Sequence, residues 1–251
     1  MRSRYPSSST LAYSFGPGPL TSAIKAIVIA NVVAFVVSLV FPTITRMFGL
    51  RPADIFGHLY LWQPVTYMFL HAGIFHILFN MLALWMFGVE LERMWGSRFF
   101  VQYYFICGVG AAMTTVLLSF VPGSFGAQLY YSLTIGASGA IYGILLAYAL
   151  YFPNRPILLY FVFPIPAKYF VAIMGGISLL SSMSGPGGGI AHTTHLGGLV
   201  AGYLYLKGGR IHLLSEFKYR YLKWRINRMR RKFDVYSGGR SEKSHWDRNV
   251  H

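Results

Sequence analysis

Long apolar stretches, separated by short polar or proline- and glycine-containing breaks, make up most of the chain. Six of them are long enough and evenly apolar enough for membrane-spanning helices, because a helix of a soluble core shows apolar residues on one face only. They cover about residues 22–41, 73–89, 98–120, 137–152, 166–183 and 190–207. The pattern predicts an all-α integral membrane protein with six transmembrane helices.

The connection between the first two stretches, residues 42–72, has a different pattern. It is amphipathic and aromatic, and prolines interrupt it. Such a segment suits the membrane interface, where it can lie flat and partly re-enter the bilayer. The later connections are shorter, and we expect a loop over residues 121–135, a break at FPNRP (residues 152–156) and a flexible link at SGPGGG (residues 184–189).

Composition agrees with a membrane protein and excludes an ordinary soluble domain. Hydrophobic residues make up 55% of the chain and charged residues only 12%, whereas about 25% of the residues of soluble domains are charged. The single cysteine, Cys107, excludes an intramolecular disulfide.

The net charge is +15, and much of it lies near the C-terminus. From Lys207 onward there are 13 Lys and Arg against 4 Asp and Glu, which gives +9. Next to a membrane domain, such a segment is typical of a cytoplasmic tail that lies against anionic lipid, and we expect this rather than binding to nucleic acid. Residues 1–21 are rich in Ser, Gly and Pro and lack the apolar stretch of a signal peptide, so we expect them to be disordered.

The distribution of Lys and Arg between the two sides of the membrane predicts the orientation. Only Arg46 and Arg51 lie on the side opposite the two termini. By the positive-inside rule, both termini are therefore cytoplasmic. The predicted organisation is a cytoplasmic N-terminus (1–21), a six-helix membrane domain (22–207) and a basic cytoplasmic tail (208–251).

Strongly polar side chains inside apolar stretches are costly, so they mark candidate functional sites. The stretch HAGIFHILFN contains His71, His76 and Asn80, and the last two are four residues apart on one helix face. Such groups can serve as polar contacts between helices. Three donors near one end of a helix favour a site that binds developing negative charge.

The stretch IGASGAIYG places a serine where a predicted helix begins. Gly136 lets the chain turn into the helix, and Ser138 falls in its first turn, where backbone N–H groups lack helical partners and can receive an oxyanion. Tyr142 lies one turn further on the same face, and Gly139 and Gly143 permit close approach of another helix. Helix caps and packing serines look the same, so the motif alone is weak support for catalysis.

The stretch AHTTHLGGLVAG contains His192 and His195, followed by Gly198 and Gly202 on the face of His195. Docking of these glycines against the glycines of the preceding motif brings Ser138 within reach of His195. This mutual fit predicts a serine nucleophile with a histidine base.

A serine–histidine–aspartate triad needs a carboxylate, and the chain has few acidic residues. Glu92 belongs to the opposite end of its helix, where we expect it to pin a loop by hydrogen bonds. Asp54 in the first connection stays open as a partner of the histidine. The simplest interpretation is a Ser138–His195 dyad with Tyr142 stacked against the imidazole.

A metal site is the competing interpretation, because imidazole binds zinc. The candidate ligands are His71, His76, His192 and His195. No carboxylate or thiolate accompanies them, and they lack the i, i+4 histidine pair of HExxH zinc sites. We therefore expect neither a metal nor a cofactor.

Taken together, HAGIFHILFN, GASGAIYG and AHTTHLGG resemble the motifs of the rhomboid intramembrane serine proteases. The resemblance covers about residues 22–207 and implies a rhomboid-like helical bundle with an amphipathic first loop. It implies Ser138 as nucleophile and His195 as general base. It also implies supporting roles: an oxyanion hole of His76, Asn80 and the Ser138 backbone N–H, Tyr142 beneath the histidine, His71 above the site, and Gly136 as the first glycine of its motif.

The resemblance implies an endopeptidase of the six-span bacterial or archaeal type, in the inner cell membrane. It would cleave a spanning segment of a single-span membrane protein near its outer end, after the fifth segment moves aside. The alternative is a catalytically silent relative that binds and escorts spanning segments. Such relatives usually lack the serine or the histidine, and both are present here. One departure is that many relatives have a Trp-Arg pair where this chain has Trp62 and Gln63.

Overall fold

The structure is a computed structural model that describes residues 16–159, 163–182, 189–208, 223, 224 and 228, with the backbone only at 159 and 189–191. The chain divides into two units, Met1–Lys207 and Gly208–His251. Almost all of the predicted basic tail, and most of the predicted N-terminal segment, lie outside the described residues.

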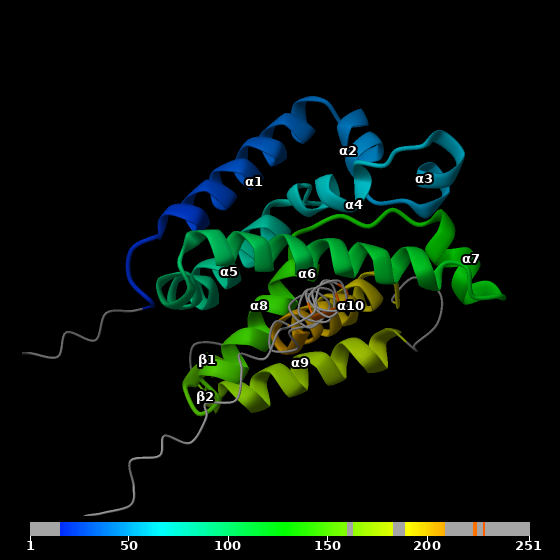
Figure 1. The fold of residues 1–251 in the computed structure, drawn as a ribbon. Helices are drawn as coiled ribbons and strands as arrows, with labels where there is room; N and C mark the ends of the chain where they lie inside the picture. Colours follow the sequence, from blue (N-terminus) through cyan, green and yellow to red (C-terminus); the bar gives the residue numbers. More distant parts are fainter. Residues whose placement is uncertain (1–15, 160–162, 183–188, 209–222, 225–227, 229–251) are drawn as a thin grey trace, which may run out of the picture. The chain divides into compact units, whose positions relative to one another are not determined.

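Each of the six predicted apolar stretches coincides with one long helix of the first unit (Figure 1). The helices are α1 (Ser22–Val40), α5 (Ile74–Trp95), α6 (Ser97–Leu118), α8 (Ser138–Tyr151), α9 (Ala167–Ser182) and α10 (Gly189–Gly208). Most ends agree with the sequence prediction within one or two residues. The exception is α5, which continues past the predicted end at Val89 until Gly96, where φ is +79°. Charged residues ended the predicted apolar stretch, but charge does not end a helix.

By length and apolar composition, three helices in the described part of the chain can cross a membrane: α1, α5 and α6. α8 and α9 are also apolar but shorter, with 14 and 16 residues. α10 has 20 residues, and its polar His-Thr-Thr-His sequence lowers its apolar character. The count of six spans therefore stays a prediction.

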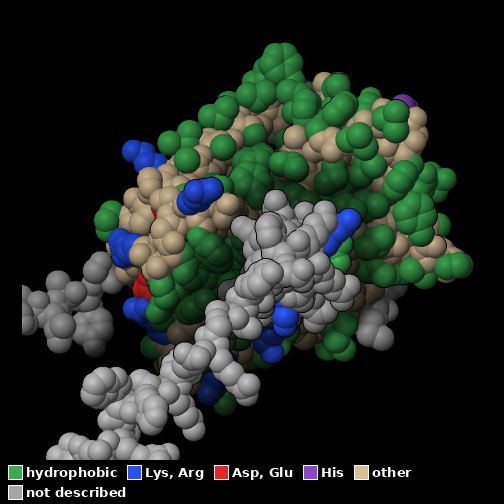
Figure 2. Space-filling view, in the orientation of Figure 1, with side chains coloured by type: hydrophobic (Ala, Val, Ile, Leu, Met, Phe, Trp, Pro, Cys, Tyr) green, Lys and Arg blue, Asp and Glu red, His purple; other side chains and the backbone are tan. Residues whose placement is uncertain are grey.

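The outer surface of the bundle is apolar, as expected for a membrane protein. Along α1, for example, Ile29, Val33 and Leu39 are more than half exposed. Figure 2 shows hydrophobic side chains spread over much of the visible face, with Lys and Arg at a few places on it. A helix that is apolar on all sides and exposed on most of them is suited to lipid, so the chain folds as a helical membrane bundle.

The connections contain short elements that the apolar pattern did not predict. The first connection folds into α2 (Thr43–Phe48), α3 (Pro52–His58), α4 (Gln63–Thr66) and the 3-10 helix η1 (Tyr67–Phe69). The predicted loop after α6 contains α7 (Ser124–Tyr131). Between α8 and α9, β1 (Pro156–Leu159) and β2 (Phe163–Pro166) pair as antiparallel strands. The bundle is thus not purely helical.

α8 forms the centre of the bundle, since ten of its 14 residues are buried. It packs along α6, where the hydroxyl of Tyr103 donates to the carbonyl oxygen of Gly143 at 2.7 Å. Hydrogen bonds of this kind satisfy polar groups that lipid cannot solvate. The site described below lies at the N-terminal end of this helix.

Glu92 joins the beginning of α1 to the end of α5. Its carboxylate, 3% exposed, accepts hydrogen bonds from the backbone N–H groups of Ala23 and Ile24 at 2.9 and 3.0 Å, and from the hydroxyl of Thr21. The hydroxyl of Ser97 donates a further bond at 2.6 Å. A carboxylate at this place supplies the N-terminal N–H groups of α1 with partners and favours the helix dipole. Glu92 therefore has the predicted hydrogen-bonding role, although it pins a helix start rather than a loop.

Candidate active site

Ser138 and His195 form the centre of the candidate site. Ser138 is the first residue of α8, and His195 lies on α10, 57 residues later in the sequence. The Ser138 Oγ and the His195 Nε2 are 2.8 Å apart, a hydrogen-bonding distance. The hydroxyl therefore lies where an imidazole nitrogen can receive its proton.

Glycines let α8 and α10 approach closely enough for this contact. A side chain at Gly198 would collide with the carbonyl oxygen of Gly139, and a Cβ at Gly202 would lie 3.2 Å from the Cα of Gly143. The backbones of the two helices thus touch along the two glycine stripes, and any larger residue there would separate the helices.

The imidazole of His195 is held by a ring contact instead of a carboxylate. Tyr142, one turn after Ser138 on α8, stacks on it with 4.2 Å between ring centroids and 8° between the planes. The His195 Nδ1 has no hydrogen-bond partner among the described residues. Asp54 lies on α3, where it pairs with Arg51 at 3.4 Å and with His58 at 3.5 Å. The carboxylate that the sequence left open is thus engaged elsewhere.

His76 reaches the same place from α5. A Cβ built on Gly136, whose φ is +122°, would lie 2.8 Å from the His76 Nε2 and 3.7 Å from the Ser138 Oγ. The backbone N–H of Ala72 donates to the His76 Nδ1 at 3.3 Å. With Nδ1 as acceptor, the neutral ring carries its proton on Nε2. The lack of a side chain at Gly136 thus leaves a space that lies between the His76 Nε2 and the Ser138 hydroxyl.

Asn80 lies one turn after His76. One of its amide N–H groups donates to the carbonyl oxygen of His76 at 2.7 Å, within its own helix. An asparagine amide has a second N–H donor, and the Asn80 Oδ1 has no partner among the described residues. The side chain is only 7% exposed, so it keeps unused hydrogen-bonding capacity in a buried place.

Two further histidines lie close to these residues. The ring of His71, 4% exposed, meets the ring of His76 edge to face, with 5.0 Å between centroids. Burial, together with the neighbouring His76, lowers the pKa of His71 to about 4, so His71 is neutral at pH 7. His192 meets His195 edge to face at 5.7 Å. Within the described residues, no three His, Cys, Asp or Glu side chains are grouped as metal ligands.

The segment that leads to Ser138 is fixed by the first connection. Leu50 and Thr134 pair as an antiparallel bridge, with N–H to oxygen bonds of 2.9 and 2.8 Å. The N–H of Gly136 donates to the carbonyl oxygen of Tyr67 at 2.9 Å. Sequence reasoning missed these contacts, because main-chain pairing between distant segments leaves no residue pattern.

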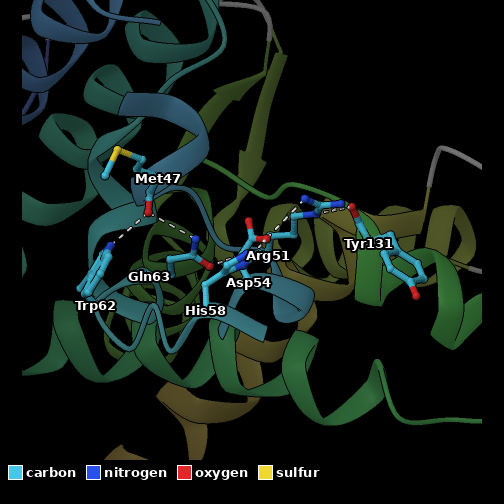
Figure 3. A network of polar contacts seen from close by, with 7 residues as sticks. All are labelled: Met47, Arg51, Asp54, His58, Trp62, Gln63 and Tyr131. Carbon is cyan, nitrogen blue, oxygen red and sulfur yellow. Dashed lines mark hydrogen bonds and ion pairs between the residues drawn. The ribbon is translucent and has the colours of Figure 1, made fainter. Parts of the chain in front are cut away.

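Gln63 anchors the first connection (Figure 3). Its side chain is fully buried, accepts from the N–H of Arg51 at 3.0 Å and donates to the carbonyl oxygen of Met47 at 3.3 Å. The indole N–H of Trp62 donates to the same oxygen at 3.0 Å, and the Arg51 guanidinium donates to the carbonyl oxygen of Tyr131 at 3.0 Å. A neutral amide therefore does the anchoring in this chain.

Comparison with known proteins places the chain in a family. A model of the rhomboid domain matches residues 58–209. Similar proteins include Rhomboid protein 1, mitochondrial, of Saccharomyces cerevisiae, 33% identical over 138 residues (55% of this chain, 38% of that protein). Rhomboid protease GluP of Bacillus subtilis is 32% identical over 158 residues (62% and 27%), and Rhomboid protease AarA of Providencia stuartii 29% over 157 residues (57% and 54%). The chain thus matches between about a quarter and about half of the length of these relatives. Because the domain model covers more than half of the chain, the chain belongs to the rhomboid family.

Proposed function

We propose that the protein is an intramembrane serine endopeptidase that cleaves transmembrane segments of other membrane proteins. The observation that carries this proposal is the 2.8 Å contact between the Ser138 Oγ and the His195 Nε2, inside an apolar helical bundle. Two of the similar proteins are named rhomboid proteases, which supports the same reaction. The serine and the histidine are both present, which disfavours a silent protein that only escorts spanning segments.

The reaction begins with attack of the Ser138 hydroxyl on the peptide carbonyl. His195 takes the hydroxyl proton on Nε2 as the bond forms, and later gives it to the leaving amine. Water then attacks the acyl-enzyme, with His195 again taking the proton and returning it to Ser138 as the ester breaks. Both half-reactions use the one contact between these two side chains.

The tetrahedral intermediate carries a negative charge that needs donors. His76 has its Nε2 proton beside Gly136, Asn80 has a second amide N–H, and the Ser138 backbone N–H lies at the start of α8, where helical partners are lacking. We assign these three groups to the oxyanion hole. A single donor of this kind typically contributes about 2.7–4 kcal/mol to transition-state binding.

A dyad without a carboxylate suits this environment. An ionised carboxylate deep in an apolar bundle is costly, and burial would favour its protonated form. The Tyr142 ring can hold the imidazole from its face without adding a charge. His195 thereby keeps one nitrogen on the nucleophile and a fixed ring plane.

The depth of the site follows from the length of α8. Its 14 residues span about 21 Å, which is shorter than the roughly 30 Å hydrocarbon core of a bilayer. A helix of this length does not reach both surfaces, and we propose that its Ser138 end lies below the membrane surface. This depth favours a substrate that is itself embedded in the membrane, and single-span proteins present the simplest such segment.

The arrangement in the cell is part of the proposal. Six spans with both termini in the cytoplasm put Ser138 near the outer face of the inner membrane, and cleavage would release the outer part of the substrate. We further propose the organisation 1–21, 22–207 and 208–251, with the basic tail against anionic lipid on the cytoplasmic side.

The test combines labelling with cleavage. The protein, purified in detergent, is treated with a fluorophosphonate probe and separately given a single-span substrate. We expect Ser138 to be labelled and the substrate to be cut within or next to its span. If the substrate is bound but not cut, and the probe leaves Ser138 unlabelled, the result would favour the escort function and reject the protease.

A further inference from the structure

We propose that Ser178 on α9 is a positioning residue for catalysis, which acts on His195 through Tyr142. The proposal rests on the protease function given above. It extends the site from α8 and α10 to a third helix.

The contact that carries the inference is a buried hydrogen bond. The Ser178 Oγ lies 3.0 Å from the Tyr142 hydroxyl, and Ser178 is fully buried. Its neighbours Ile177 and Leu179 are 49% and 52% exposed, so this serine points into the bundle from a helix that otherwise faces outward here. A hydroxyl placed this way has to find a protein partner, and its partner is Tyr142.

Tyr142 links this bond to the base. One end of the tyrosine, the hydroxyl, is held by Ser178, and its ring face lies on the imidazole of His195 at 4.2 Å. The three side chains thus form a chain of contacts from α9 through α8 to α10.

The link matters because few contacts orient His195. In a triad, a carboxylate holds the second ring nitrogen and fixes the imidazole plane. Here that nitrogen, Nδ1, has no partner in the described part of the chain, and the Nε2 contact with Ser138 is broken and remade during the reaction. The stack on Tyr142 and the edge contact with His192 are therefore the contacts that persist, and the stack is as rigid as the tyrosine ring.

Removing the Ser178 hydroxyl would leave the Tyr142 hydroxyl without this partner in a buried place. The tyrosine would then gain rotational freedom as its hydroxyl seeks another partner, and the imidazole would follow. We place neither Ser178 nor Tyr142 in substrate binding or in the oxyanion hole, so we expect the loss in the chemical step, with α9 packed against α8 as in this structure.

The experiment compares Ser178→Ala, Tyr142→Phe and the double variant in full-length protein, with cleavage of a single-span substrate in proteoliposomes. A typical hydrogen bond is worth a factor of roughly three to ten. We expect kcat to fall by this factor in each single variant, with KM unchanged. The double variant should fall no further than either single variant, because both remove the same bond. Ser178→Thr keeps the hydroxyl and should restore kcat.

The matched control is Ser182→Ala on the same helix, because the Ser182 hydroxyl donates to the carbonyl oxygen of Leu179 on its own helix at 2.7 Å. It should leave kcat unchanged. Unaltered kcat in Ser178→Ala, or losses that multiply in the double variant, would overturn the proposal. If Ser178→Ala unfolds, the rate at which the fluorophosphonate probe labels Ser138 in Tyr142→Phe tests the proposal instead. A labelling rate equal to that of the unmodified protein would reject the proposal. Failure of the protease function itself is recognised separately, since the unmodified protein would then cut nothing.

Discussion

The polar clusters around Glu92 and around Ser138 are built in opposite ways. Around Glu92, donors from α1 and from the α5–α6 junction converge on one carboxylate and supply it with five hydrogen bonds. Around Ser138 and His195 there is no carboxylate, and polar atoms such as the His195 Nδ1 and the Asn80 Oδ1 have no partner among the described residues.

The two clusters therefore suit different roles: one stabilises the structure, and the other is suited to chemistry. Buried polar groups in proteins are nearly always satisfied, because an unmade hydrogen bond is costly. A saturated cluster such as that of Glu92 stabilises a helix junction and has nothing left to offer a ligand. A cluster with unused donors and acceptors gives up stability and can bind a transition state. Whether the buried polar atoms have hydrogen-bond partners thus distinguishes two groups of residues that look alike in the sequence.

The largest expected effect is the loss of turnover when the reacting pair is broken. Ser138→Ala or His195→Ala should each lower the turnover of a single-span substrate by at least about a thousandfold, and the double variant should be no worse, since the pair acts as a unit. The midpoint of thermal unfolding should change little, because the cluster is not saturated. A loss of turnover smaller than about tenfold in either variant would contradict the assignment.

A smaller effect is expected from moving the pair apart. In Gly198→Ala the new side chain would meet the carbonyl oxygen of Gly139 and push α10 from α8. We expect turnover to fall by about a hundredfold, because misplacement by about 1 Å can reduce rates by this much. Overpacking should also lower the free energy of unfolding by about 1–3 kcal/mol.

The control for this change is Gly176→Ala on α9, where a Cβ meets nothing within 4 Å. It should keep full turnover and raise the free energy of unfolding by up to about 1 kcal/mol, because alanine favours a helix. Equal turnover in the two glycine variants would show that close helix packing does not position the dyad.

Removing Glu92 should lower stability and leave turnover unchanged, which is the reverse of the effect of breaking the dyad. Glu92→Ala leaves five donors without their acceptor, and we expect the free energy of unfolding to fall by about 2–4 kcal/mol. Turnover per folded molecule should stay near that of the unmodified protein. Chemical denaturation, with turnover measured on the folded fraction, checks both.

Glu90 provides a comparison on the same helix. Its ion pair with Arg155 is partly exposed, so Glu90→Gln should change the free energy of unfolding by less than about 1 kcal/mol. A Glu92→Ala protein as stable as Glu90→Gln would refute the link between saturation and stability.

The smallest effect concerns Gln63, whose side-chain amide makes hydrogen bonds to the backbone of Arg51 and of Met47 in the first connection. Gln63→Leu keeps the volume but leaves the N–H of Arg51 without its acceptor, and should lower the free energy of unfolding by about 1–3 kcal/mol. Arg46→Gln, an exposed change nearby, should stay within about 0.5 kcal/mol. Thermal unfolding of the two variants side by side measures the difference.

The long helices were predictable because apolar runs end at proline, glycine or charge. The short elements were not. α7 and the strand pair β1–β2 depend on their surroundings, and an apolar sequence such as PILL pairs as a strand only once a partner strand is present. The end of α5 was misplaced because the sequence shows where lipid contact ends, whereas the helix ends at Gly96.

The proximity of Ser138 and His195 could be inferred because glycine stripes mark which helix faces meet. The surroundings could not. A serine such as Ser178 has no spacing pattern that marks it, and the donation of the Asn80 amide to its own helix is a choice between rotamers. Contacts from η1 and the first connection to the segment before Ser138 are main-chain bonds, and any sequence can make them.

The separation of Ser138 and His195 along the chain also orders events during synthesis. The proposed nucleophile is made with α8, but its proposed base comes with α10, the last long helix of the described chain. Until α10 has entered the membrane and its glycines have docked on α8, the hydroxyl has no base and the chain carries only an ordinary serine. Under the proposed function, proteolytic competence would therefore coincide with completed assembly, and an unfinished chain could not attack its neighbours in the membrane.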